Sequence, residues 1–271
     1  MNVPPVDPPL LSVDKLEVVY HRAITAVQGV SLRVGRGQIV AILGNNGAGK
    51  TTTLRAVSGF LGIDDARVTE GTIAFDGIPL TNRTPYEITR RGVVLVPERD
   101  KVFPNLTVAE NLLAGVSRAS ASRRRRLEEQ VYEQFPQLAT LKRREAGLLS
   151  GGERQMLAIA SALVCEPTLL LIDELSAGLA PVVVQGLMQR LGDIRRSFEI
   201  AILLVEQSAA VALEVADYGY VLENGRVVLD GDPRRLAAHS DVREFYLGQG
   251  AGGRRSYRDV KQYRRSRRWY G

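Results

Sequence analysis

The sequence predicts an α/β fold in which a parallel sheet is covered by helices on both faces. Short apolar segments, such as residues 39–43 and 169–172, alternate with segments of helical periodicity, and strands of this kind are buried on both faces. A glycine-rich loop follows the first of these segments, and two acidic residues follow the second. At 271 residues, 45% of them apolar, the chain can form a full core, as one large domain or a domain with a subdomain.

The expected strands are short and rich in apolar residues. In chain order they cover residues 16–20, 30–34, 38–43, 71–75, 93–96, 168–173, 200–205, 218–223 and 226–229. The last two flank Asn224-Gly225, which is typical of a tight hairpin turn. Three expected helices, at residues 108–116, 124–135 and 153–164, have no clear strand between them. We therefore expect an α/β core at about 12–97 and 165–232, interrupted by a helical insertion at about 98–164.

The charge of the chain is unevenly distributed. The net charge is +6, but residues 252–271 contain eight arginines or lysines and one aspartate, so the remainder is close to neutral. The single cysteine, Cys165, excludes an internal disulfide and fits a reducing compartment. No apolar run approaches the roughly 18 residues that span a bilayer, and residues 1–5 do not resemble a secretory signal. We expect a soluble protein that is cytoplasmic or peripheral to a membrane.

The segment Gly44-Asn45-Asn46-Gly47-Ala48-Gly49-Lys50-Thr51 is the most informative part of the chain. Its spacing, G-x4-G-K-[ST] between a strand and a helix, is that of a phosphate-binding P-loop. Glycines allow successive backbone N–H groups to point at phosphate oxygens, and the following helix adds the positive end of its dipole. Lys50 can reach the β- and γ-phosphates, and the Thr51 hydroxyl can bind Mg²⁺. We expect these residues, with Thr52, to bind a nucleotide.

Two acidic residues, Asp173 and Glu174, follow the apolar segment 169–172. Unpaired buried charge is costly, and in an open α/β sheet the ligand lies beyond the carboxyl ends of the strands. Neighbouring strand residues point to opposite faces, so the two acids can have different roles. We expect Asp173 to hold Mg²⁺, partly through water, and Glu174 to polarise the water that attacks the γ-phosphate. The alternative is an acidic pair that only caps the next helix.

A third motif, Leu149-Ser150-Gly151-Gly152-Glu153-Arg154-Gln155, precedes an apolar helical pattern. Ser150 and Glu153 have the spacing of a capping box, which accounts for these two residues without a ligand. Gly151 and Gly152 weaken the start of a helix unless the backbone must approach another group closely. We expect that group to be a phosphate.

The three motifs, in this order and with the third inside a helical insertion, resemble those of the ATP-binding cassette (ABC) ATPases, whose own signature is LSGGE. The resemblance covers about residues 16–248. It implies a P-loop NTPase core with an N-terminal antiparallel β subdomain and an inserted α-helical subdomain, in an ABC ATPase domain at residues 12–248.

The same resemblance implies a composite site. In the family two cassettes pair head to tail, so Ser150, Gly151 and Gly152, with Glu153 beside them, would close over ATP held by the P-loop of the other cassette. This chain has one P-loop and one signature, so it would need a second ABC ATPase subunit. Tyr20 stands where the family has an aromatic residue that stacks on adenine; a tyrosine packed on the core is the alternative.

Further stretches resemble one branch of the family, the ATPase subunits of branched-chain amino-acid (Liv-type) importers. They include Leu95-Val96-Pro97-Glu98-Arg99, Gly178-Leu179-Ala180-Pro181 and Leu204-Val205-Glu206-Gln207. The branch implies an ATPase, using ATP and Mg²⁺, that powers import of branched-chain or other apolar amino acids. It also implies membrane permease subunits as partners, an indirect link to a substrate-binding protein, and a place on the inner face of the cell membrane.

Three positions depart from the general family pattern. Glu98 replaces a glutamine in the loop that senses the nucleotide, and Gln207 replaces a histidine that contacts the γ-phosphate; we expect both to take part in catalysis. Gln207 cannot carry a positive charge, and Glu98 adds a negative charge near the phosphates. A nucleotide-gated clamp with weak hydrolysis, paired to a more active subunit, therefore remains open. Leu175 replaces a proline, which we expect to loosen the turn after Glu174.

Residues 249–271 have no counterpart in the resemblance, and we expect them to form a flexible basic tail. Four aromatic residues, Tyr257, Tyr263, Trp269 and Tyr270, are interleaved with its arginines. Such a tail can contact anionic lipid, bind nucleic acid as part of a non-transport ABC ATPase, or be a solvated disordered segment. The last of these is favoured.

Overall fold

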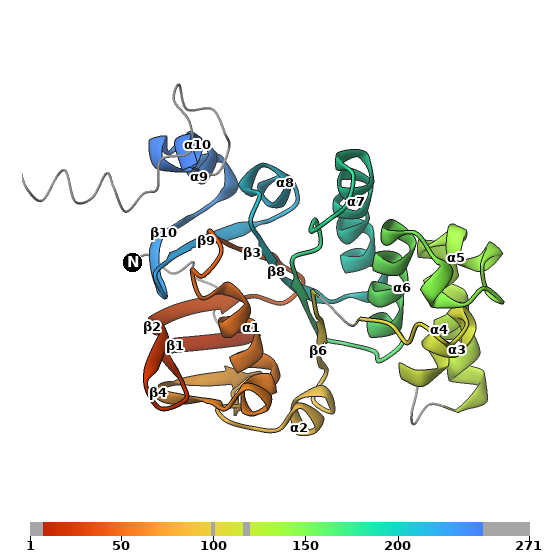
Figure 1. The fold of residues 1–271 in the computed structure, drawn as a ribbon, viewed down its shortest axis with the longest axis horizontal. Coiled ribbons are helices and arrows are strands. Elements are labelled where there is room, and N and C mark those ends of the chain that lie inside the picture. The colour runs from red at the N-terminus through yellow and green to blue at the C-terminus, as the bar shows by residue number, and fades with distance from the viewer. Residues whose placement is uncertain (1–7, 99–100, 116–119, 246–271) are drawn as a thin grey trace, which may run out of the picture.

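The computed structural model describes residues 8–98, 101–115 and 120–245, which form two sheets (Figure 1). The first sheet is antiparallel, with strand order β2-β1-β4-β5. Its strands are β1 (Leu11–Tyr20), β2 (Ile24–Val34), β4 (Ala66–Phe75) and β5 (Ile78–Pro79). β1 alternates buried and half-exposed residues along most of its length, as is usual for a strand with one face on a core.

The second sheet has six strands in the order β10-β9-β3-β8-β7-β6. They are β3 (Ile39–Leu43), β6 (Val93–Val96), β7 (Leu169–Asp173), β8 (Ala201–Glu206), β9 (Tyr218–Glu223) and β10 (Arg226–Gly231). Neighbouring strands from β6 to β9 run parallel, and β10 pairs antiparallel with β9 through the predicted hairpin. All residues of β3, β7 and β8 are buried, because both faces of this sheet are covered.

Alternate residues of the parallel strands belong to two separate cores. On β3, Ile39, Ala41 and Leu43 pack with the helices on one face. Val40 and Ile42 pack on the other face, with the antiparallel sheet and helix α1 (Lys50–Ser58). The sequence predicted helices on both faces; in the structure the antiparallel sheet covers much of the second face, as Figure 1 shows below the parallel strands.

Helices fill the chain between β6 and β7. They are α3 (Val108–Gly115), α4 (Ala121–Gln134), α5 (Pro136–Thr140), the 3₁₀ helix η2 (Ala146–Leu148) and α6 (Gly151–Leu163). Figure 1 shows α3 to α6 gathered at one end of the molecule, far from α1. No strand lies between β6 and β7 among the residues that the structure describes.

The remaining helices lie outside this insertion. They are η1 (Phe60–Asp64), α2 (Pro85–Thr89), α7 (Pro181–Phe198), α8 (Ala209–Leu213), α9 (Pro233–Ala238) and α10 (Ser240–Phe245). The α/β fold class is thus confirmed, with its antiparallel sheet and inserted helices. The bounds 12–248 for the domain stay a prediction, and the predicted tail at 249–271 lies outside the described residues.

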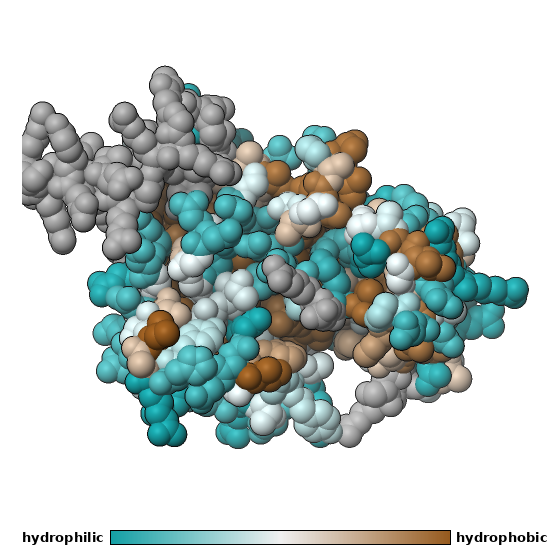
Figure 2. Space-filling model, viewed as in Figure 1, coloured by the Kyte–Doolittle hydropathy of each residue, from teal (hydrophilic) through white to brown (hydrophobic). Residues whose placement is uncertain are grey.

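The surface gives no sign of a membrane-spanning helix. Within the described ranges, no helix combines the length and apolar character needed to cross a bilayer. Figure 2 shows a mostly hydrophilic face on which apolar residues form scattered groups.

Candidate nucleotide-binding site

The P-loop joins β3 to α1, and its backbone favours glycine at Gly44, Gly47 and Gly49. Gly49 has a φ of 99°, a conformation that other residues rarely adopt. A Cβ on Gly44 would lie 2.5 Å from the carbonyl oxygen of Leu222 on β9. Asn45, Asn46 and Gly47 are exposed at the tip of the loop, while Ala48 to Lys50 are buried. The loop is therefore packed at its base and open at its tip.

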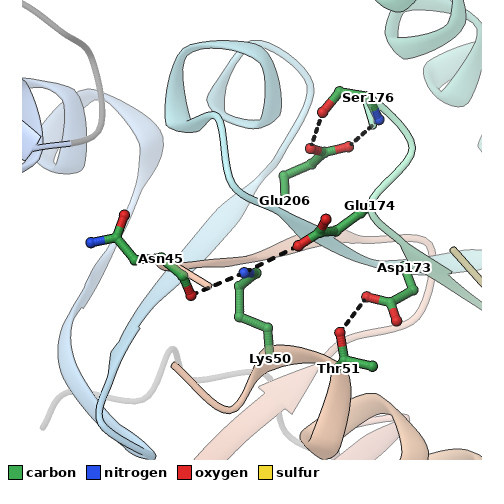
Figure 3. Close-up of polar contacts among 7 residues, drawn as sticks. All are labelled: Asn45, Lys50, Thr51, Asp173, Glu174, Ser176 and Glu206. Carbon is green, nitrogen blue, oxygen red and sulfur yellow. Dashed lines mark hydrogen bonds and ion pairs between the residues drawn. The ribbon is translucent and has the colours of Figure 1, made fainter. Parts of the chain in front are cut away.

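Lys50 lies buried at the centre of the site, with only 4% of its surface exposed. Its Nζ donates to the backbone carbonyl of Asn45 at 3.3 Å and forms an ion pair with Glu174 Oε1 at 3.3 Å (Figure 3). Gly49, which precedes α1, supplies no side-chain cap. The first N–H groups of α1 thus have no capping side chain, as in a helix that binds phosphate.

Asp173 ends β7 and lies against the first turn of α1. The Thr51 hydroxyl donates to Asp173 Oδ1 at 3.0 Å. Burial, with smaller contributions from the nearby Glu174 and Glu98, raises the pKa of Asp173 to about 6, although the Thr51 hydrogen bond and Lys50 oppose the shift. A hydroxyl and a carboxylate this close supply the hard oxygen ligands that Mg²⁺ prefers, alongside water and phosphate oxygens. These residues fit Mg²⁺.

The turn after β7 is tightly held. Glu174 has a φ of 46°, and its backbone N–H donates to the carbonyl of Val205 at 3.0 Å. Leu175 is completely buried and packs in the core beneath the helices. Burial of this side chain helps to hold the turn, and the expected loosening relative to proline stays a prediction.

Three other predicted residues approach the same edge of the sheet. The Tyr20 hydroxyl and the Thr52 hydroxyl are hydrogen-bonded at 3.2 Å, so the end of β1 reaches the first turn of α1. Glu98 follows β6 and is close enough to Asp173 to affect its pKa. Gln207 follows β8 and is exposed. Because β6, β7 and β8 are parallel neighbours, Glu98, Asp173 and Gln207 lie at one edge of the sheet.

Ser150 and Glu153 form a complete capping box at the start of α6. The Glu153 backbone N–H donates to Ser150 Oγ at 3.3 Å, and the Ser150 backbone N–H donates to Glu153 Oε2 at 2.7 Å. These hydrogen bonds hold the pKa of Glu153 below its ordinary value. α6 packs in the core between the parallel sheet and the inserted helices, whereas α1 packs in the core between the parallel sheet and the antiparallel sheet. The structure therefore keeps the two motifs on opposite faces of the sheet.

The two glycines of this motif also have neighbours within the chain. A Cβ on Gly151 would lie 3.0 Å from the side chain of Leu179, and one on Gly152 would lie 2.8 Å from the side chain of Val183. Contact with the start of α7 is thus one reason for glycine here. The expected approach of a phosphate remains a prediction.

Sequence reasoning missed the role of Glu206. This last residue of β8 is completely buried, and its carboxylate accepts hydrogen bonds from the Ser176 backbone N–H at 3.0 Å and from the Ser176 hydroxyl at 2.6 Å (Figure 3). The sequence did contain a signal, since an acid at the end of a wholly apolar strand must have a partner. The partner was not identifiable because it lies 30 residues earlier in the chain.

The parallel sheet, the P-loop at its edge and the acids that face Lys50 and Thr51 together define a nucleotide-binding protein of the P-loop class. A family model described as "ABC transporter" matches residues 27–177. The chain belongs to this family, as its motifs predicted.

Relatives and solved structures agree. The chain is 40% identical over 239 residues to the high-affinity branched-chain amino acid transport ATP-binding protein BraG of Pseudomonas aeruginosa, covering 88% of this chain and 100% of that protein. It is 35% identical to the probable branched-chain amino acid transport ATP-binding protein LivF of Archaeoglobus fulgidus, covering 81% of this chain and 91% of that protein. A crystal structure of an ATP-binding cassette of an ABC transporter in the ADP conformation superposes with a TM-score of 0.77 at 26% identity. The superposition covers 89% of this chain and 99% of that one.

Proposed function

We propose that this chain is the ATP-hydrolysing subunit of a membrane importer for branched-chain or other apolar amino acids. The observation that carries the proposal is the pairing of Lys50 with Glu174 beside the pairing of Thr51 with Asp173. The named relatives, which are branched-chain amino acid transport ATP-binding proteins, support the substrate class.

Each residue of the site has a distinct role in this proposal. The loop N–H groups and Lys50 bind the phosphates of ATP, and Tyr20 stacks on adenine. Thr51 and Asp173 would hold Mg²⁺, which would supply positive charge beside the phosphate oxygens. Glu174 accepts the proton of the attacking water. ATP would compete with Glu174 for Lys50, and this exchange would free the Glu174 carboxylate for water.

The assembly is a second part of the proposal. Ser150, Gly151 and Gly152 close over ATP bound to another ABC ATPase subunit in a head-to-tail dimer. The segment from Glu98 to Phe103 passes the closure to membrane permease subunits, which receive their cargo from a substrate-binding protein. This places the chain on the inner face of the cell membrane, where the basic tail can touch anionic lipid. The exposure of Ser150 and Gly151 supports contact with a partner.

Glu98 and Gln207 support a second candidate, a nucleotide-gated clamp with weak hydrolysis. Glu98 adds a carboxylate near Asp173, and the exposed Gln207 can donate a hydrogen bond to phosphate but carries no charge. Single-turnover hydrolysis in the assembled transporter, with the P-loop lysine of each cassette replaced in turn, separates the two candidates. An importer ATPase hydrolyses ATP at this chain's own site, whereas a clamp only binds it there.

The main test replaces the proposed base. Glu174→Gln should abolish turnover, by at least about 100-fold, while ATP binding is kept, because the amide cannot accept a proton from water. The measurements are phosphate release and ATP affinity on the full chain in its assembled complex. Hydrolysis at the wild-type rate by Glu174→Gln would refute the role of Glu174.

A further inference from the structure

Glu206 is a buried acid that the proposed mechanism does not use. It ends β8, the strand that lies between β3 and β7, and its residue is completely buried. In the register of the sheet Glu206 is level with Leu43, which precedes the P-loop, and its neighbour Val205 is level with Asp173. A carboxylate in this position costs free energy unless it is fully hydrogen-bonded.

Its hydrogen bonds all go to the turn that carries Glu174. Ser176 donates twice, from its backbone N–H at 3.0 Å and from its hydroxyl at 2.6 Å. The Glu206 carboxylate is therefore bound by a residue that lies only two positions after Glu174.

The turn is thus fixed to β8 at two levels. Glu174 donates its backbone N–H to the carbonyl of Val205, and Ser176 binds the Glu206 carboxylate. Glu174 is also the charged group that faces Glu206, and the repulsion between them adds to burial in raising the pKa of Glu206. Lys50 pairs with Glu174 on its other side, so the Glu174 side chain lies between a fixed cation and a fixed turn (Figure 3).

We propose that Glu206 is a positioning residue for ATP hydrolysis: its carboxylate holds the turn at residues 174–176, so that Glu174 stays aimed at the nucleotide. The inference rests on the proposed role of Glu174 as the base.

The test compares variants that remove or keep these hydrogen bonds. Glu206→Ala removes the acceptor, whereas Glu206→Gln keeps it, because the Ser176 hydroxyl can reorient and accept from the amide. Ser176→Ala removes one donor only. We expect kcat to fall about 10- to 100-fold for Glu206→Ala, less for Ser176→Ala, and within about threefold of wild type for Glu206→Gln. ATP affinity should change by less than about twofold.

A matched control is Asp217→Ala. Asp217 is another carboxylate that accepts from backbone, since the N–H of Ile39 at the amino end of β3 donates to it at 2.8 Å. Its loss should lower thermal stability without lowering kcat, because it lies at the opposite edge of the sheet from the P-loop. All variants are assayed as full chains in the assembled transporter, in steady state at saturating ATP, with the P-loop lysine of the partner cassette replaced.

Combination with Glu174→Gln separates this inference from the proposed function. A positioning residue acts through the base, so adding Glu206→Ala to Glu174→Gln should not lower the residual rate further. If Glu174→Gln hydrolyses ATP normally, the proposed function fails. The positioning role of Glu206 is overturned if Glu174→Gln is inactive but Glu206→Ala keeps wild-type kcat. It is also overturned if Glu206→Ala, Ser176→Ala and Glu206→Gln all lose kcat only in proportion to their losses of ATP affinity and thermal stability.

Discussion

At the scale of residues, three carboxylates around the ends of β7 and β8 have three different partners. Asp173 accepts from a hydroxyl, Glu174 pairs with a buried lysine, and Glu206 accepts from a neighbouring turn. The partner determines what each acid can do. Asp173 can bind a metal ion, Glu174 can lose its ion pair when a phosphate binds Lys50, and Glu206 holds the backbone of the turn in place. Acid type alone does not distinguish them.

The raised pKa of Glu206 predicts a pH-dependent stability. Burial raises this pKa, so the favourable contribution of Glu206 is fully present below the ordinary glutamate value of about 4.3 and is lost as pH rises through the raised value. Glutamine does not titrate. The stability of Glu206→Gln relative to wild type should therefore increase as pH rises from the ordinary glutamate value of about 4.3 through the raised value. Chemical denaturation without nucleotide at a series of pH values measures this difference.

Glu153 provides a control of opposite sign. Hydrogen bonds from Ser150 lower its pKa, so its contribution is present above the ordinary value and is lost as pH falls through the lowered one. Glu153→Gln should therefore lose stability relative to wild type as pH rises from the lowered value through the ordinary glutamate value of about 4.3. Parallel pH curves for wild type and Glu206→Gln would contradict the assignment of a raised pKa to Glu206.

At the scale of elements, reciprocal capping boxes begin α2, α3 and α6 in the described part of the chain, and those of α2 and α6 have different surroundings. Ser150 and Glu153 cap α6, and Thr84 and Glu87 cap α2 with the same pattern of hydrogen bonds. The two boxes stabilise their helices by the same local means. Only the box on α6 belongs to the predicted signature. A comparison of the two boxes therefore distinguishes a role in helix stability from a role in nucleotide binding.

Replacement of each cap by alanine tests this difference. Ser150→Ala and Thr84→Ala should each lower the free energy of unfolding by about 1 kcal/mol, because each helix loses an acceptor for its first turn. Only Ser150→Ala should also reduce ATP turnover in the assembled transporter. Denaturant midpoints and phosphate release measure the two effects. Equal turnover in both variants would leave Ser150 as a helix cap and nothing more.

Local patterns predicted most strands and the three longest helices of the insertion, but not the short helices or α7. Strands β3, β6 and β7 are short apolar runs that show up directly in the sequence. The helix α7 begins with Pro181 and three valines and contains Gly186 and Gly192, which are poor helix formers. It forms because it buries Leu187, Met188 and Leu191 against the core, and such tertiary burial does not appear in local propensity.

The same limit applies to the site. The P-loop was predictable because its function depends on one continuous segment with fixed spacing. The contact of Tyr20 with Thr52 spans 32 residues and that of Ser176 with Glu206 spans 30, and only the pairing of strands brings such residues together. The sequence placed Asp173 and Glu174 at a sheet edge correctly, but it could not assign their individual partners.

At the scale of the whole molecule, the two glycine-containing motifs belong to different cores. α1 packs on the face that carries the antiparallel sheet, and α6 packs among the helices of the other face; Figure 1 shows the parallel strands between them. A closed site that uses both the P-loop and the Ser150-Gly151-Gly152 motif is therefore readily explained if each motif comes from a different chain. This geometry supports the predicted head-to-tail dimer, in which the exposed Ser150 of one subunit faces the exposed tip of the P-loop of the other.

The last prediction concerns the basic tail. Residues 252–271 carry a net charge of +7, from eight basic residues and one aspartate, and basic residues near anionic lipid gain about 1 kcal/mol each. Deleting residues 252–271 should weaken binding to vesicles that contain phosphatidylserine. It should leave ATP hydrolysis unchanged, because the predicted site residues all lie between Tyr20 and Gln207. Vesicle sedimentation at low and high salt measures the first effect, since screening by salt weakens electrostatic binding. Neutral phosphatidylcholine vesicles are the control, and equal sedimentation of the full-length and truncated chains with anionic vesicles would exclude lipid contact by the tail.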